Sequence, residues 1–333
     1  MRDLVTPDDS RDLFRALGAL LLGVGVLVLS VRKDGPSGFV ENEGWGSWAL
    51  FSVYLAAAVV LYGGAVATIR ATGGLRKWQA IASVFGLVFV PFALSNLVDA
   101  VGGSPDAPMN VCWIAAVTAA LGFYAGIVAG VRFQVLAGAL AALVAYLSFF
   151  DEVLTDGVFA DVNLLRGLLL AYAVVTVAVG IFLWRRDREG IWQFSELLTA
   201  AGIYAVAATL LLSLTGSIGE SIQSAFALGG DGGGESPSGL WDVAGLLVSL
   251  FLIVTAAWIG TRGPVYVGAI GLVLFAIVAG QDLNADPGDR ENGFFWWPFI
   301  LLVLGTGAIL ASLLPGVSLG RRPRRLVRKV SGR

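Results

Sequence analysis

The chain has 333 residues, of which 57% are hydrophobic and only 14% charged, and its formal net charge is −2. Soluble domains carry about 25% charged residues, so this composition excludes an ordinary soluble protein and indicates that lipid surrounds most of the chain. There is no histidine, and Cys112 is the single cysteine. These counts exclude an intrachain disulfide, a histidine base and histidine metal ligands.

Ten apolar stretches approach the roughly 20 residues that a transmembrane helix needs. They predict an all-α, polytopic membrane helix bundle of about ten spans, near 13–31, 47–69, 79–101, 111–131, 133–150, 164–184, 195–215, 240–260, 264–281 and 294–314. The domain plan is then an N-terminal segment at 1–12, a transmembrane domain at 13–315 and a basic tail at 316–333. Very short connections at Arg132 and at Thr261–Gly263 predict two tight hairpins, between spans four and five and between spans eight and nine.

Basic residues set the predicted orientation, because lysine and arginine in short loops stay in the cytoplasm. They fall before span one, in alternate loops and in the tail, and the intervening loops are acidic. Both termini are therefore expected in the cytoplasm. The pattern rests on Arg11, Arg15, Arg70, Arg76, Lys77, Arg132, Arg185, Arg186, Arg188 and Arg262, and it is broken by Arg32, Lys33, Arg166 and Arg290.

A weak internal repeat runs through the predicted spans. A shift of 118 residues aligns Ser30 with Ser148 and Ser95 with Ser213, and also Tyr54 with Tyr172 and Arg70 with Arg188. It predicts that spans one to four are repeated as spans five to eight, with a hairpin added. Because a four-span unit keeps its orientation when repeated, the repeats would be parallel, whereas a five-span unit would give inverted repeats.

Acidic and amide groups gather at the predicted outer ends of the spans. Ser95 lies one helical turn before Asp99, and Ser148 one turn before Glu152, so each pair shares a helix face. If these helix ends converge, they form an external acidic vestibule for a cation or a polyol. The alternative is that helix ends are polar because they reach water. The vestibule candidates are Asn96, Asp99, Asp151, Glu152, Gln281 and Asp282.

One predicted external loop has oxygen ligands at the spacing of a calcium loop. Its candidate ligands are Asp282, Asn284, Asp286 and Asp289. The match is partial, since Pro287 replaces the usual glycine and Gly293 the usual bidentate glutamate. Calcium is thus a weak candidate, and otherwise no cofactor is expected.

Two features concern helix geometry. Pro91 lies inside span three and predicts a kink about one turn below Asn96. Span four carries Gly122, Gly126 and Gly130 at four-residue spacing, which predicts close helix packing or, alternatively, a dimer contact.

The preferred functional interpretation is a transport protein for a small molecule or a lipid, in the cell membrane of a prokaryote. The first alternative is a non-catalytic scaffold or partner subunit, working through the glycine-rich face and the basic tail. The second is an enzyme that acts on a lipid-linked substrate with Asp151 and Glu152, and it ranks lowest because histidine is absent. The expected partners are the bilayer, anionic lipid at the basic tail, and a second copy or another membrane protein, but no nucleic acid.

Overall fold

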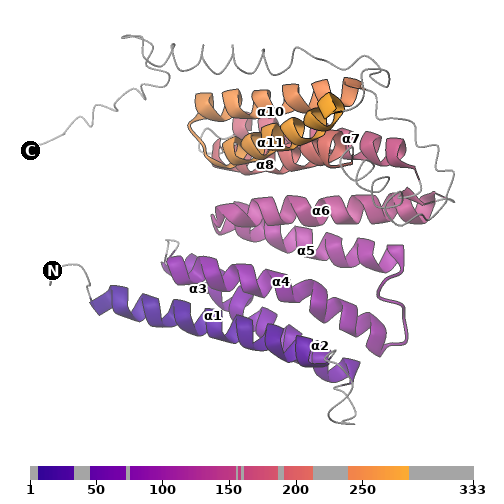
Figure 1. The fold of residues 1–333 in the computed structure, drawn as a ribbon. Coiled ribbons are helices and arrows are strands. Elements are labelled where there is room, and N and C mark those ends of the chain that lie inside the picture. The colour runs from indigo at the N-terminus through magenta and orange to yellow at the C-terminus, as the bar shows by residue number, and fades with distance from the viewer. Residues whose placement is uncertain are drawn as a thin grey trace, which may run out of the picture. The chain divides into compact units, whose positions relative to one another are not determined.

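The computed structural model describes residues 7–33, 46–72, 76–154, 157–158, 161–186, 191–212 and 239–284. All regular secondary structure within these residues is helical (Figure 1). The chain divides into two compact units, Met1–Ala200 and Ala201–Arg333. The prediction of an all-α chain is therefore confirmed for the described residues.

The described residues of the first unit contain eight helical elements before α8. Of these, α2, η2 and α3 follow one another directly and form one continuous helical run, in which η2 is a π-helical turn. The elements are α1 (Pro7–Lys33), α2 (Ser47–Ala58), η2 (Val59–Gly63), α3 (Gly64–Thr72), α4 (Lys77–Ala100), α5 (Pro108–Val128), α6 (Arg132–Val153) and α7 (Val162–Arg186), and then α8 (Ile191–Val206) continues into the second unit.

Five helical stretches of the described chain are long and apolar enough to cross a membrane. They are Ser47–Ile69, Trp78–Ala100, Pro108–Val128, Arg132–Val153 and Val162–Arg186. They coincide with the second to sixth predicted spans. The helical character and apolarity are those of a membrane-embedded protein. The predicted tenth span, 294–314, lies outside the described residues.

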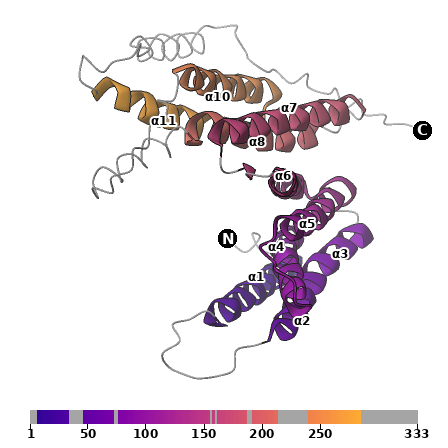
Figure 2. The same ribbon diagram turned by 90° about the vertical axis from the view of Figure 1, so that its right-hand side faces the viewer.

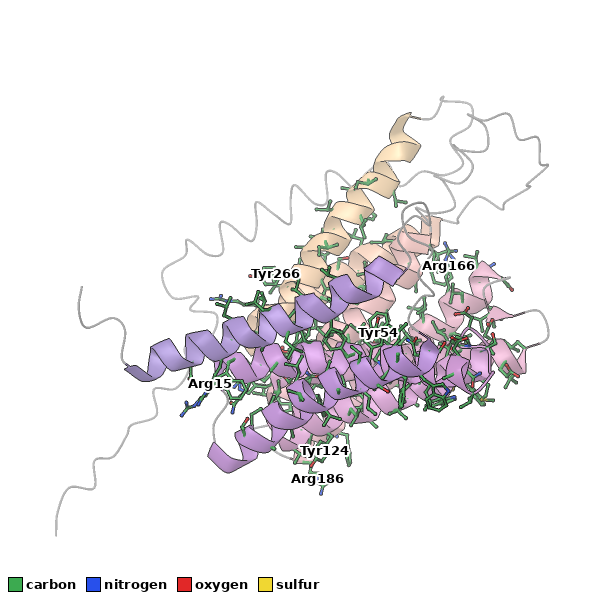
Figure 3. The ribbon with its side chains drawn as sticks, turned by 90° about the horizontal axis from the view of Figure 1, so that it is seen from below. Arg15, Tyr54, Tyr124, Arg166, Arg186 and Tyr266 are labelled. Carbon is green, nitrogen blue, oxygen red and sulfur yellow. The ribbon has the colours of Figure 1, made fainter. Side chains whose placement is uncertain are left out.

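The core of the first unit forms where α1, α2 and α4 lie side by side (Figures 1 and 2). Its buried side chains are mostly small or aromatic, and Phe89 of α4 is completely buried. The Tyr54 ring (Figure 3) lies with its centre 6.1 Å from that of Phe89 and 5.7 Å from that of Phe92. Such aromatic pairs add to the stabilisation from burial alone.

The α5–α6 hairpin packs backbone against backbone. A Cβ atom added to Gly122 would lie 2.8 Å from the Cα of Gly138, and one added to Gly126 would lie 2.9 Å from the backbone nitrogen of Val135. Larger residues at these positions would force the two helices apart. Small residues are the usual means by which membrane helices approach closely, because dispersion contacts rather than the hydrophobic effect hold helices together in lipid.

The second unit is built by the end of α8, the π-helical turn η5 (Ala207–Leu211), α10 (Gly239–Ile259) and α11 (Gly263–Asn284). Leu210, Leu252, Ala256 and Phe275 are at most 2% exposed and form its core. The hydroxyl of the buried Ser249 donates to the Gly245 carbonyl oxygen at 2.7 Å. This bond satisfies a polar group that neither lipid nor the apolar core would accept.

Candidate functional site

The predicted vestibule residues of α4 lie at its C-terminal end. Asp99 is exposed, and its Oδ2 accepts a hydrogen bond from the Ser47 hydroxyl at the start of α2. The Asn96 side chain instead donates to the Phe92 carbonyl oxygen of its own helix, at 2.8 Å. Asp99 thus ties two neighbouring helix ends together while one side of its carboxylate stays open to solvent.

Asp151 and Glu152 lie at the C-terminal end of α6. The Oδ1 of Asp151 accepts a hydrogen bond from the backbone N–H of Val158 at 2.9 Å, which fastens the connection towards α7. Glu152 next to it is exposed. Within the described chain, no hydrogen bond or ion pair joins Asp99 to Asp151 or Glu152, so their convergence on one vestibule remains a prediction.

The remaining predicted site residues fall near or beyond the end of α11. The α11 backbone extends to Asn284, but the side chains of Gln281, Asp282 and Asn284 are outside the described part, as are Asp286 and Asp289. The calcium loop is therefore still a prediction. Among the described residues there is no group of three or more acidic or cysteine side chains placed to hold a metal ion.

The three glycines of the predicted packing run have different positions. Gly122 and Gly126 face α6 of the same chain, whereas Gly130 follows the end of α5 with φ +72° and has open space where a Cβ would be. The Gly122–Gly126 face is accordingly covered within the chain. The Gly122–Gly126 face is thus not open to a partner, whereas the basic tail, the other part of the scaffold hypothesis, lies outside the described residues. Pro91 lies within α4, which runs through it from Lys77 to Ala100.

An arginine cluster, which the sequence analysis did not identify, occupies the end of the first unit where α1 and α4 begin. Arg76 donates to Asp12 at 3.1 Å, and Arg15 lies 3.6 Å from the same carboxylate oxygen. The Arg15 guanidinium, near the start of α1 in Figure 3, is 5.7 Å from the centre of the Trp78 ring. The cluster links α1 to the start of α4 at the end that we expect to face the cytoplasm.

Two glutamines near this end are completely buried. Both amide atoms of Gln79 have a partner: its Nε2 donates to Thr68 at 3.1 Å, and its Oε1 accepts from the Arg76 backbone N–H at 2.7 Å. Gln134 on α6 has no hydrogen-bond partner for either amide atom among the described residues. Neither glutamine was a predicted site residue, because both lie within a turn of a helix start, where polar residues commonly reach water.

Two π-helical turns interrupt otherwise regular apolar helices. In η2 the Tyr62 hydroxyl donates to the Leu121 carbonyl oxygen of α5, so the widened turn is bound to a neighbouring helix. In η5 the Thr209 hydroxyl donates to the Ala205 carbonyl oxygen at 2.7 Å. Such turns carry one extra residue, are rare, and are frequent at functional sites. No sequence signal distinguished these segments from ordinary apolar helix.

Comparison of the chain with models of protein families, with curated proteins and with solved structures found no match.

Proposed function

We propose that the chain is a multi-pass membrane transport protein with about ten spans, which moves a small molecule or a lipid across the cell membrane. The five long apolar helices support membrane insertion. The finer parts of the proposal are the full span count, the cytoplasmic termini and the transport activity. Each has its own support in the described residues.

The span count is supported by exposed apolar stripes on three further helices. Each stripe repeats at the four- and three-residue steps of one helix face. The members are Leu17, Leu21, Val24 and Val28 on α1, Leu247, Phe251, Val254 and Trp258 on α10, and Tyr266, Ile270, Val273 and Ile277 on α11. The 21 residues of α10 extend about 30 Å, close to the thickness of the hydrocarbon core. Contact with lipid explains these exposed apolar faces, because apolar patches of this kind are unfavourable in contact with water.

The orientation is supported by where the arginines lie. Arg15 and Arg76 meet in the arginine cluster, Arg132 and Arg262 follow the tight turns of the two hairpins, and Arg186 ends α7. All five belong to helix ends that the ten-span arrangement places on one side. A basic cytoplasmic face is the rule for short loops of membrane proteins.

The observation that carries the transport proposal is the pair of π-helical turns, η2 and η5, inside apolar helices. Membrane transporters place interrupted helices where substrate binds, because the freed backbone groups are available to a ligand. Here one turn lies in each unit, and Tyr62 of η2 is tied to α5 by its hydroxyl. Because the Tyr62 hydrogen bond joins η2 to α5, a change in this bond would alter the conformation of both elements. The exposed carboxylates of Asp99 and Glu152 would form part of the external entrance, with Asn96, Asp151, Gln281 and Asp282.

The test uses purified protein in proteoliposomes. The vesicles are incubated with a defined mixture of metal cations, polyols, amino acids and fluorescent phospholipids, and retained solutes and flipped lipid are measured against protein-free vesicles. One class should move faster with the protein present. Asp99→Asn should change that rate while the helical circular dichroism is kept, because asparagine still accepts from Ser47. Asp106→Asn, in the connection before α5, is the matched control and should have no effect.

If no solute or lipid moves faster than in protein-free vesicles, the transport proposal is rejected, and a stable co-purifying membrane protein would then support the partner-subunit hypothesis. If Asp99→Asn and Asp106→Asn change the transport rate equally, Asp99 is not part of the external entrance.

A further inference from the structure

The turns of the two hairpins share three features. In each, a glycine with positive φ (+72° and +76°) is followed by a buried residue and then by an exposed arginine. The buried residue donates its backbone N–H to a carbonyl oxygen of the preceding helix at 3.1 Å, that of Ala125 in the first turn and that of Ala256 in the second. The two sets are Gly130, Val131 and Arg132, and Gly260, Thr261 and Arg262, and every member of the second lies 130 positions after its counterpart. The two acceptors differ by one position under this shift.

The same shift of 130 residues relates the close contact between α5 and α6 to the one between α10 and α11. A Cβ added to Gly138 would lie 3.1 Å from the Ala119 carbonyl oxygen and 3.0 Å from the Phe123 backbone nitrogen. A Cβ added to Gly268 would lie 2.7 Å from the Ser249 carbonyl oxygen and 3.3 Å from the Ile253 backbone nitrogen. All three positions correspond, although only the glycine is the same residue. The agreement is thus one of backbone packing and not of side-chain chemistry.

The helix lengths agree as well. α5 and α10 have 21 residues each, and α6 and α11 have 22 each. With the 130-residue shift, the ends of each matched pair coincide to within one residue. The likeness of the two glycine-containing turns therefore continues through the helices on either side.

A second correspondence lies elsewhere in the chain. The Arg15 guanidinium lies 5.7 Å from the centre of the Trp78 ring, and the Arg132 guanidinium lies 3.7 Å from that of Trp192. In the ten-span arrangement these arginines begin spans one and five, and the tryptophans begin spans three and seven. The arginines are 117 positions apart and the tryptophans 114, close to the shift of 118 that the sequence predicted.

We infer that the chain is built from parallel copies of a four-span unit, in which α5–α6 and α10–α11 are two copies of one hairpin. The shift is about 118 residues for the arginine–tryptophan pairs and 130 residues for the hairpins. The additional residues of the second copy therefore belong to the connection between η5 and α10. A single 118-residue shift, as predicted from the sequence, does not extend to the hairpins.

This inference deepens the proposed function and rests on its membrane topology. Parallel copies are related by an axis along the membrane normal, whereas inverted repeats are related by an axis in the membrane plane. The shift also makes Glu152 of α6 equivalent to position 282 of α11, which is an aspartate. Each of the two hairpins would then carry an acidic residue near the C-terminal end of its second helix.

The experiment labels single cysteines in the full chain with a membrane-impermeant maleimide, in a Cys112→Ala background. Arg132→Cys and Arg262→Cys should be labelled from the same side of the membrane, and Asp106→Cys from the other. Labelling of Arg132→Cys and Arg262→Cys from opposite sides would overturn the parallel repeat. The labelling does not depend on transport, so a failure of the inference and a failure of the proposed activity are distinguishable.

A second arm tests the hairpin equivalence directly. Gly126 faces Val135 in the first hairpin, so the 130-residue shift predicts that Ala256 faces Val265 in the second. Ala256→Cys with Val265→Cys should form a disulfide on mild oxidation, detected by mass and by protection from maleimide. Ala257→Cys with Val265→Cys is the control and should stay reduced, because position 257 is exposed. The opposite result would show that the two hairpins pack differently.

Discussion

The guanidinium of Arg132 lies 3.7 Å from the centre of the Trp192 ring, so the start of α6 is joined to the start of α8 by a cation–π contact. Both side chains are exposed, and contacts of this kind contribute about 0.5–1 kcal/mol at exposed sites. A double-mutant cycle with Arg132→Ala and Trp192→Ala should give a coupling of that size in detergent-induced unfolding followed by circular dichroism. Losses that simply add would show that the contact contributes nothing.

The two buried glutamines should respond in opposite ways to replacement by methionine. Gln79→Met removes two hydrogen bonds and leaves their partners unpaired, so it should lower the free energy of unfolding by about 1–3 kcal/mol. Gln134→Met removes an amide that has no partner among the described residues, and it should raise the free energy of unfolding by about 1–3 kcal/mol. The same unfolding assay compares both variants with the parent. Destabilisation by Gln134→Met would mean that its amide is bound to water or to a ligand.

The α5–α6 interface should not tolerate a methyl group. Gly138→Ala places a Cβ 3.0 Å from the Phe123 backbone nitrogen, and such overpacking costs about 1–3 kcal/mol. The matched control is Gly167→Ala on α7, where a Cβ meets nothing within 4 Å. This control should be neutral or stabilising by up to about 1 kcal/mol, since alanine is the better helix former. Equal effects of the two substitutions would contradict the close packing.

The hairpin turns should require glycine for conformational reasons alone. Gly130 has φ +72° with open space around it, so Gly130→Ala should cost about 1–2 kcal/mol through backbone strain. Gly130→Asn should cost less, because asparagine enters the left-handed region more easily. Gly25→Ala, at a helical position of α1 that also has open space, is the control. Identical thermal unfolding of Gly130→Ala and Gly130→Asn would show that the turn is not held in this conformation.

Sequence reasoning located the helices well because each depends on a local property. A run of about 20 apolar residues must form internal backbone hydrogen bonds in lipid, so the run alone predicts a helix. The tight turn at Arg132 was predicted for the same reason, since two apolar runs adjoin there. The position of Gly130 outside the helix was not predicted, because four-residue spacing does not show where a helix ends.

The contacts between distant residues were beyond sequence reasoning. Asp99 was selected as an outer carboxylate, but its bond from Ser47 depends on how α2 and α4 lie side by side. The arginine cluster joins Asp12 to Arg76 across 64 positions, and no local pattern indicates that pairing. The π-helical turns lie at Val59–Gly63 and Ala207–Leu211, and no local pattern indicates them because both segments have the composition of ordinary apolar helix.

The brevity of the connection between α5 and α6 limits how this pair of helices can come apart. Only residues 129–131 separate the last residue of α5 from the first of α6, and the face between the two helices is closed by glycine. A link of three residues spans only about 10 Å, so the two helices stay together at this end even if the rest of their contact opens. A substitution that breaks the glycine contact should therefore separate the far ends of α5 and α6 while the turn stays closed.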